Sequence, residues 1–200
     1  MPADQPLSVL EIGFGNGEFA AFCRRRGYEY ACTEIDPELV DRAVEHGFAA
    51  RIATQDLAQS FGAEAFDLIC CFDVLEHLEQ QEIIVMLSAF AKLLRADGRV
   101  IARFPSGDSP FSFAMFNSDI THRTHIGRGA VFQFCIASGL TAAQIRHPVM
   151  PIRGLGLRRA IRRAMVCAGR WAVRNFVRKI FFDNAPRVVD PNMLIVLQRA

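Results

Sequence analysis

The sequence predicts one α/β domain built on a mostly parallel seven-stranded sheet, with helices on both faces and an antiparallel last strand. Short apolar runs alternate regularly with amphipathic stretches along the 200 residues. A repeated strand–helix–strand order implies right-handed crossovers onto a parallel sheet. The length supports one domain with a sizeable core and is short for two.

Seven apolar runs are the expected strands. The run at Phe66–Phe72 is continuous, as in a strand that is buried on both faces, and the run at Ala50–Ala53 is the weakest of the seven. In chain order the strands are Leu7–Ile12, Tyr28–Ile35, Ala50–Ala53, Phe66–Phe72, Arg99–Phe104, Leu140–Arg146 and Met193–Leu197.

Helices are expected between these strands because the intervening stretches carry boundary signals. Asp36 is a suitable N-cap before Pro37, and proline fits the first position of a helix. Gly27, Gly47 and Gly139 follow three of the stretches as stop signals. The expected helices are Glu18–Arg26, Pro37–His46, Gln80–Arg95 and Arg128–Ser138.

Two stretches lie outside this alternation. Residues 105–127 are polar and interrupted by serine and proline, and residues 149–191 contain a basic, amphipathic helical segment. We expect a single domain over residues 1–200, with these two stretches as insertions on the substrate side.

Charge is distributed unevenly along the chain. Residues 1–152 carry 12 Lys/Arg against 19 Asp/Glu, whereas residues 153–182 carry nine basic side chains and no acidic one. As a helix, residues 157–174 would separate apolar side chains from arginines. Three interpretations of the basic segment 153–181 stay open: a helix packed on the domain with a solvated arginine face, peripheral contact with an anionic membrane, and binding of an anionic acceptor or RNA. The acidic body disfavours an extended nucleic-acid surface.

Composition also bears on the compartment. The first residues show no basic region followed by an apolar run, and no apolar stretch is long enough to span a bilayer. The six cysteines have no CxxC pairing and fall mostly within apolar runs, as reduced, buried thiols do. We therefore expect a cytoplasmic protein, with peripheral contact at the inner membrane face as an open alternative.

A glycine-rich loop follows the first expected strand and precedes the first helix, in the stretch Glu11-Ile-Gly-Phe-Gly-Asn-Gly17. Glycines at this place let the chain turn tightly and let its backbone approach a ligand. The spacing is GxGxG. A dinucleotide-binding loop would place another glycine where this chain has Glu18, which disfavours a nicotinamide oxidoreductase.

The loop and the acidic residues at later strand ends together resemble the class I S-adenosylmethionine-dependent methyltransferases, a Rossmann-like family. The resemblance covers about residues 7–146. It implies that Glu34 holds the ribose hydroxyls of S-adenosylmethionine, that Asp56 accepts from the adenine amino group, and that Phe72 and Asp73 line the methionine end. The implied cofactor-binding residues are Glu11, Gly13, Phe14, Gly15, Asn16, Gly17, Glu34, Ile35, Asp56, Leu57, Phe72 and Asp73.

The chemistry of the donor suits this set. S-adenosylmethionine has no pyrophosphate, so its loop need not be a strict anion nest. Its two vicinal ribose hydroxyls are donors that a carboxylate can accept together. Its sulfonium and ammonium groups are cationic, so acidic strand ends suit them. The alternative interpretation of Glu34 and Asp56 is that they are surface carboxylates at the starts of loops.

Methyl transfer to a hydroxyl or an amine requires alignment and the removal of one proton. His122 and His125, in the polar stretch after the fifth strand, are the candidate catalytic bases. In the alternative interpretation, His122 helps to anchor the next helix and His125 faces solvent. No metal site is expected, because His122, His125 and Asp119 have no further ligands near them. For Glu76 and His77 a structural role is favoured over catalysis.

These features predict an S-adenosylmethionine-dependent methyltransferase, with O-methylation of a small or lipid/glycan-linked acceptor favoured. The alternative is a catalytically weak methyltransferase-like module that binds an anionic membrane or RNA through the basic helix.

Overall fold

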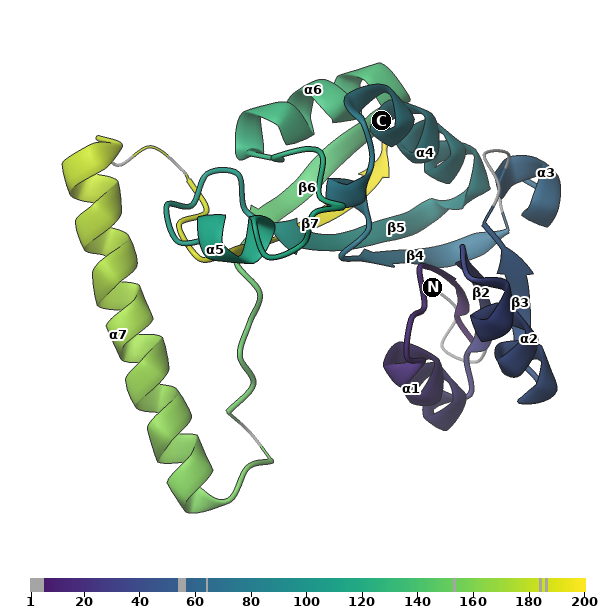
Figure 1. Cartoon of the computed structure of the whole chain (residues 1–200), viewed down its shortest axis with the longest axis horizontal. Helices are drawn as coiled ribbons and strands as arrows, with labels where there is room; N and C mark the ends of the chain where they lie inside the picture. Colours follow the sequence, from purple (N-terminus) through teal and green to yellow (C-terminus); the bar gives the residue numbers. More distant parts are fainter. Residues whose placement is uncertain (1–5, 54–56, 64, 153, 184, 186) are drawn as a thin grey trace.

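The computed structural model describes residues 6–53, 57–63, 65–152, 154–183, 185 and 187–200. They form one seven-stranded sheet with the strand order β3-β2-β1-β4-β5-β7-β6 (Figure 1). The strands are β1 (Ser8–Ile12), β2 (Glu29–Glu34), β3 (Ala49–Ile52), β4 (Phe66–Phe72), β5 (Leu94–Pro105), β6 (Leu140–Arg146) and β7 (Asn192–Arg199).

The pairing confirms a mostly parallel sheet with an antiparallel last strand. β1 pairs in parallel with β2 and β4, β2 with β3, and β4 with β5, whereas β7 runs antiparallel to both β5 and β6. The strand order reverses between β1 and β4. In open parallel sheets a ligand binds at the carboxyl ends of the strands beside such a switch point, and the glycine loop follows β1.

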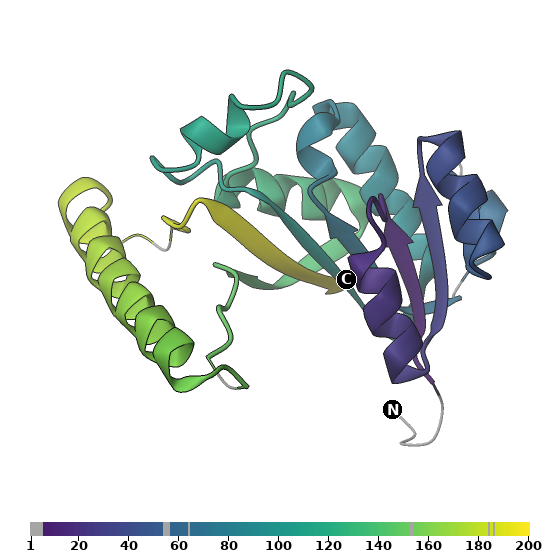
Figure 2. The same cartoon turned by 60° about the horizontal axis from the view of Figure 1, so that its bottom comes forward.

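Helices cover both faces of the sheet. α4 and α6 pack against each other on one face with α3 beside α4, whereas α1 and α2 lie on the other face next to β1–β3 (Figures 1 and 2). The helices are α1 (Glu18–Arg26), α2 (Pro37–Glu45), α3 (Leu57–Phe61), α4 (Gln80–Leu93), α5 (Phe113–Phe116), α6 (Arg128–Ser138) and α7 (Leu157–Phe181), with a short 3-10 turn, η1, at Leu75–His77.

The predicted helix boundaries are largely confirmed. The carboxylate of Asp36 accepts a hydrogen bond from the backbone N–H of Glu38 at 2.9 Å, so Asp36 is the N-cap of α2. Gly27 and Gly139 end α1 and α6 in the left-handed conformation that favours glycine. The core lies between the α4–α6 layer and the sheet, where Phe90 and Phe104 are fully buried.

One boundary differs from the expectation. We expected a helix to Arg95 and a strand from Arg99, but α4 ends at Leu93 and β5 begins at Leu94. Leu94 is extended and fully buried, and it pairs with Phe66 of β4. The burial of this side chain against the sheet outweighs the helical period, which is a local signal.

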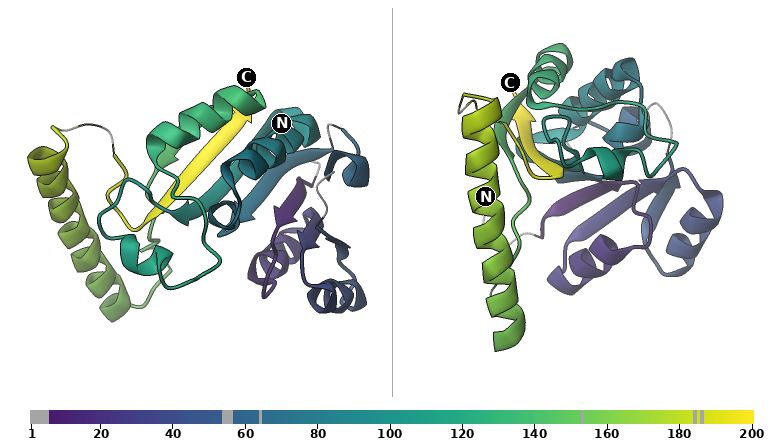
Figure 3. Two further views of the ribbon diagram at one scale, coloured as in Figure 1. Left: turned by 45° about the horizontal axis from the view of Figure 1, so that its top comes forward. Right: turned by 60° about the vertical axis from the view of Figure 1, so that its left-hand side comes forward.

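α7 differs from the other helices because it stands away from the sheet (Figures 1 and 3). It spans Leu157–Phe181, which includes the stretch 157–174 whose apolar and basic side chains separate in a helix, and it lies between β6 and β7 in the chain. All residues of α7 are described, and Val177 is the only buried one. Most of both its apolar and its basic side chains are therefore accessible.

Candidate active site

The glycine loop requires glycine at three positions. Gly13, Gly15 and Gly17 have φ angles of +71°, +50° and +73°, in the left-handed region. The backbone N–H of Gly13 donates to the carbonyl of Thr33 at 2.9 Å, which ties the loop to β2. A Cβ atom on Gly13 would lie 2.6 Å from Cγ2 of Val74, so the segment after β4 closes over the loop.

We expect Gly13→Ala to lower the free energy of unfolding by about 2 kcal/mol or more, because alanine meets both the left-handed φ angle and Val74. Urea unfolding measures this. Gly129→Ala is the matched control. Gly129 lies in α6, where a Cβ atom would meet no atom of the other described segments within 4 Å. Alanine at this helical position should therefore raise the free energy of unfolding by about 0.5–1 kcal/mol. Equal effects at the two positions would contradict the steric argument.

Glu34 joins the end of β2 to the glycine loop. Its Oε2 accepts from the backbone N–H of Gly15 at 3.0 Å, and its Oε1 accepts from the N–H of Ile35 at 2.8 Å. Each carboxylate oxygen can accept a further hydrogen bond. The carboxylate is half-buried and oriented by two backbone donors, so it fits a pair of vicinal hydroxyls. The side chain of Ile35 is exposed beside it.

An open hollow of about 510 Å³ lies at the carboxyl ends of β1 and β4. Six of the residues predicted to bind the cofactor line it, namely Glu11, Gly13, Phe14, Asn16, Phe72 and Asp73. The sequence interpretation missed four other lining residues, namely Glu18, Phe19, Phe22 and Arg103. Phe19 and Phe22 are three positions apart, a spacing that places them on one side of α1 and could have indicated a shared surface.

Arg103 is the positive group of this hollow. It projects from β5 and forms an ion pair through two nitrogens with the carboxylate of Asp73, whose φ angle is +55°. A guanidinium has five N–H donors, so the pair leaves it able to bind a further carboxylate.

Two carboxyl groups near the hollow are buried. Glu11 is 4% exposed and accepts a short hydrogen bond from the hydroxyl of Tyr30. Burial raises the pKa of Glu11 to about 7; the Tyr30 bond opposes this shift, and the charge of Glu34 adds to it. Burial likewise raises the pKa of Glu76 to about 7.

These two groups predict a pH-dependent stability. Their pKa values in the folded protein lie above the ordinary value of 4.5, so the folded state favours the protonated forms. Their stabilising contribution is complete below about pH 4.5 and is lost as the pH rises through about 7. We expect the free energy of unfolding to fall by up to about 1.4 kcal/mol per pH unit for each group in this window.

Urea unfolding across this window measures the slope. In Glu11→Gln the side-chain oxygen can still accept from Tyr30, but the group no longer titrates, so the slope should become shallower. Glu76→Gln should act in the same way. A double variant that keeps the full slope of the parent protein would show that other groups cause it.

Asp56 and Leu57 are also predicted to bind the cofactor. Asp56 lies outside the described residues. Leu57 begins α3, and its side chain is buried in the main core. Phe14 lines the hollow, and it also packs with Cys32 and Val40 between β2 and α2.

The structure brings together three side chains that the sequence interpretation left apart. One ligand atom each from Glu76, His77 and His122 lie within 4.8 Å of one another. The two imidazole rings are 4.6 Å apart between centroids. The backbone carbonyl of Glu76 accepts from the N–H groups of Arg123 and Thr124 at 2.7 and 3.1 Å, which fastens the loop that carries His122 to the segment after β4.

Hydrogen bonds fix the tautomers of both histidines. Nδ1 of His122 is 2.8 Å from the carbonyl oxygen of Phe116, so Nδ1 carries the proton and donates it. The hydroxyl of Thr121 donates to Asp119, so the same hydroxyl accepts from Nδ1 of His77, 2.8 Å away. In the neutral rings, Nε2 of each histidine therefore keeps a lone pair, and within the described part of the chain it has no hydrogen-bond partner.

Glu76 completes the cluster with a carboxyl group that is 2% exposed. Its Oε2 has no hydrogen-bond partner within the described part of the chain. A buried carboxyl oxygen beside two imidazole lone pairs could receive a proton, and the same three groups could hold a metal ion.

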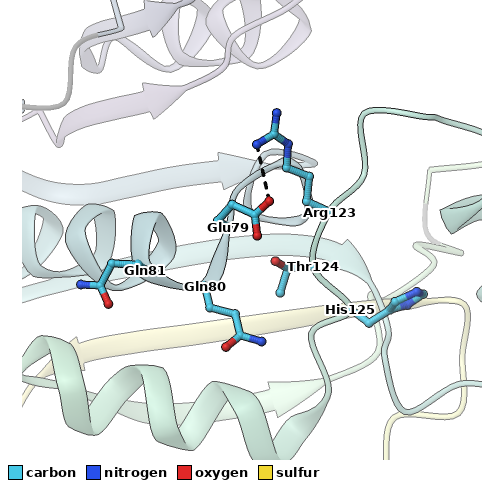
Figure 4. A pocket seen from close by; sticks show the side chains of 6 residues that line it. All are labelled: Glu79, Gln80, Gln81, Arg123, Thr124 and His125. Atoms are coloured by element: carbon cyan, nitrogen blue, oxygen red, sulfur yellow. Dashed lines mark ion pairs between the residues drawn. The ribbon is translucent and has the colours of Figure 1, made fainter.

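His125 lies in a different environment. Its ring stacks on Phe116 with centroids 3.5 Å apart and borders a polar hollow of about 480 Å³ at the start of α4. Figure 4 shows the imidazole directed away from Glu79, which pairs with Arg123 at 3.5 Å. Of the two histidines predicted from the sequence, only His122 thus belongs to the cluster with Glu76 and His77.

Comparisons with known proteins bear on the family of this chain. A family model described as "Methyltransferase domain" matches residues 1–140. A "Ubiquinone biosynthesis O-methyltransferase" from Xylella fastidiosa is 34% identical over 105 residues, which are 48% of this chain and 42% of that protein. A protein of the same name from Xanthomonas oryzae pv. oryzae is 31% identical over 98 residues, or 46% of this chain and 40% of that protein. The chain thus spans about two-fifths of the length of these curated relatives.

Solved structures support the fold. A SAM-dependent methyltransferase from Archaeoglobus fulgidus superposes with a TM-score of 0.69 at 16% identity, over 97% of this chain and 86% of that one. An S-adenosylmethionine-dependent methyltransferase from Mesorhizobium loti has a TM-score of 0.65 at 12% identity, over all of this chain and 94% of that one. The family model, the sheet order and the glycine loop agree, and the chain belongs to the class I S-adenosylmethionine-dependent methyltransferase family.

Proposed function

We propose that the chain transfers a methyl group from S-adenosylmethionine to a hydroxyl group of a small or lipid/glycan-linked acceptor. One juxtaposition carries the proposal. The loop fastened by Glu34 and the free Nε2 atoms of His77 and His122 belong to segments that follow strands at the same edge of the sheet. The curated relatives named above are O-methyltransferases, which supports a hydroxyl acceptor.

Different residues of the chain would bind different parts of the donor. Glu34 would accept from the ribose hydroxyls, since its oxygens are already aligned by Gly15 and Ile35. Arg103 would pair with the methionine carboxylate, and Asp73 would face the ammonium group. The donor supplies a methyl group bound to a sulfonium. The neutral thioether that leaves needs no further activation.

His122 would remove the proton of the acceptor hydroxyl. Its Nδ1–H bond to Phe116 leaves Nε2 as the basic atom, and the ring is half-buried against His77. The imidazolium formed in this step would lie beside Glu76, whose ionised carboxylate would stabilise the positive charge. Positioned proton transfer of this kind typically contributes a factor of about 10²–10⁴ to the rate.

Incubation with S-adenosylmethionine labelled in its methyl group tests this reaction. The acceptor panel should pair phenols and catechols with amines of the same carbon skeleton. We expect label to appear in the hydroxyl-bearing compounds, with S-adenosylhomocysteine as the co-product. Label in the amines alone would reject O-methylation. Binding of the donor without transfer to any acceptor would favour the alternative of a weak or inactive module.

We further propose that α7 docks on an anionic membrane surface. It carries eight Arg/Lys and no Asp/Glu, and large apolar side chains remain exposed on it, including Met165 at 70% and Trp171 at 64%. A helix with accessible basic and apolar side chains suits the headgroup region of an anionic bilayer. Among the described residues no helix is long and apolar enough to cross a membrane, so the contact would be peripheral.

Trp171 is the single tryptophan of the chain, so its emission reports on α7. We expect a blue shift and co-sedimentation with phosphatidylglycerol vesicles, both weakened by salt, and little binding to phosphatidylcholine vesicles. Arg158→Glu with Arg162→Glu should lower vesicle binding at least tenfold, since each basic side chain contributes about 1 kcal/mol. Arg25→Glu, the same charge reversal on α1, is the matched control. Equal binding to neutral vesicles would reject the electrostatic part of the proposal.

A further inference from the structure

A third hollow, of about 340 Å³, lies where α7 meets the body of the protein. Its walls come from the end of β6, the second half of α7 and the segment that leads into β7. Because β7 is antiparallel to β5 and β6, this hollow opens at the same edge of the sheet as the glycine loop.

The lining of this hollow is strongly basic. It contains five arginines together with His147, Trp171 and one acidic residue, Asp190. The arginines come from four separate parts of the chain, namely α6, β6, α7 and the segment before β7. They are Arg128, Arg146, Arg174, Arg178 and Arg187.

Two buried carboxylates offset only part of this charge. Arg174 pairs with Asp190 at 3.0 Å, and Arg187 pairs with Asp108 at 3.3 Å; both carboxylates are buried. Arg146 has no ion-pair partner within the described part of the chain. Among the described residues, five guanidinium groups line or border the pocket and two carboxylates pair with two of them, which leaves the pocket net positive and suited to an anion.

The surroundings of His147 are consistent with this field. Burial lowers the pKa of His147, and the positive charge of Arg174 lowers it further. In either neutral tautomer, one ring nitrogen of His147 can donate a hydrogen bond to an anion.

We propose that this pocket binds a phosphate group. Arginine is the side chain best suited to phosphate, because its planar fork offers two parallel N–H donors. Arginines that converge on one pocket from several elements match the several oxygens of a phosphate or diphosphate. The phosphate could belong to a lipid headgroup beneath α7 or to a free phosphorylated molecule at the acceptor side of the sheet.

Inorganic pyrophosphate is the probe for the first experiment. Trp171 lines the pocket, so titration of the full chain should change its emission saturably, and calorimetry gives the affinity independently. We expect Arg146→Glu to weaken pyrophosphate binding at least tenfold. Arg25→Glu makes the same charge change on α1, outside the pocket, and should alter the affinity by less than about twofold. Urea unfolding of both variants checks that they are folded.

Absence of saturable binding by calorimetry would overturn the proposal, as would equal losses in the two variants. Phosphatidylglycerol vesicles distinguish the two sources of the phosphate. If pyrophosphate competes with vesicles and Arg146→Glu weakens both, the pocket binds a lipid headgroup. If Arg146→Glu weakens pyrophosphate binding alone, the ligand is a free phosphorylated molecule. Neither the pyrophosphate nor the vesicle experiment uses S-adenosylmethionine, so failure of this proposal would not count against the proposed methyl transfer.

Discussion

Replacing Glu34 with alanine is expected to raise the dissociation constant for S-adenosylmethionine about a hundredfold or more. The variant would lose the two charge-assisted hydrogen bonds that the carboxylate accepts from the ribose hydroxyls, each worth about 1.5–3 kcal/mol. It would also lose the bond that orients Gly15 in the loop. Calorimetric titration with S-adenosylmethionine and with S-adenosylhomocysteine measures the effect, and both ligands should be weakened alike because they share the ribose.

Two variants make this expectation specific. In Glu34→Gln the amide oxygen can still accept from one backbone N–H group, so the loop should persist while the charge is lost, and an intermediate loss of affinity is expected. Glu45→Ala removes an exposed carboxylate from the end of α2 and should leave the affinity unchanged. Unaltered binding in Glu34→Ala would show that the loop holds the cofactor without this residue, and the proposed binding site would be wrong.

The parts of the fold predicted from the sequence are those with strong local signals. The continuous apolar run of β4 predicts a buried parallel strand, and Asp36 before Pro37 predicts a helix start. Glu34 could be singled out because it ends a strand beside the glycine loop in the same family pattern. In each case the residues that carry the signal lie within a few positions of one another.

The parts that escaped prediction depend on contacts between distant segments. His77 and His122 meet because the backbone carbonyl of Glu76 accepts from the loop after β5, across more than 40 positions. The helical period of α4 likewise does not reveal that Leu94 pairs with Phe66. Arg103 becomes a site residue only when β5 lies beside β4 and brings it to Asp73.

His122→Ala is expected to lower kcat by about 10²–10⁴ while the affinity for S-adenosylmethionine stays within about twofold. The large effect follows from the position of the ring. Its Nδ1 is occupied by Phe116, its Nε2 is free, and Glu76 and His77 lie beside it. The hydroxyl of an acceptor has a proton that must leave as the new bond forms, and alanine cannot receive it. Steady-state rates and calorimetry on the same preparation separate the two effects.

His125→Ala is the matched control, because that ring stacks on Phe116 outside the cluster and should change kcat by less than about threefold. His122→Gln adds a second test, since it keeps a polar group of similar size without a titrating nitrogen. A base role predicts that this variant is as slow as His122→Ala, and that the acidic limb of the pH–rate profile disappears in both. Recovery of the rate in His122→Gln would instead assign His122 a positioning role. Loss of the parent rate on chelation, restored by a divalent cation, would assign the cluster to a metal ion. These outcomes thus distinguish proton transfer, positioning and metal binding as the role of the cluster of Glu76, His77 and His122.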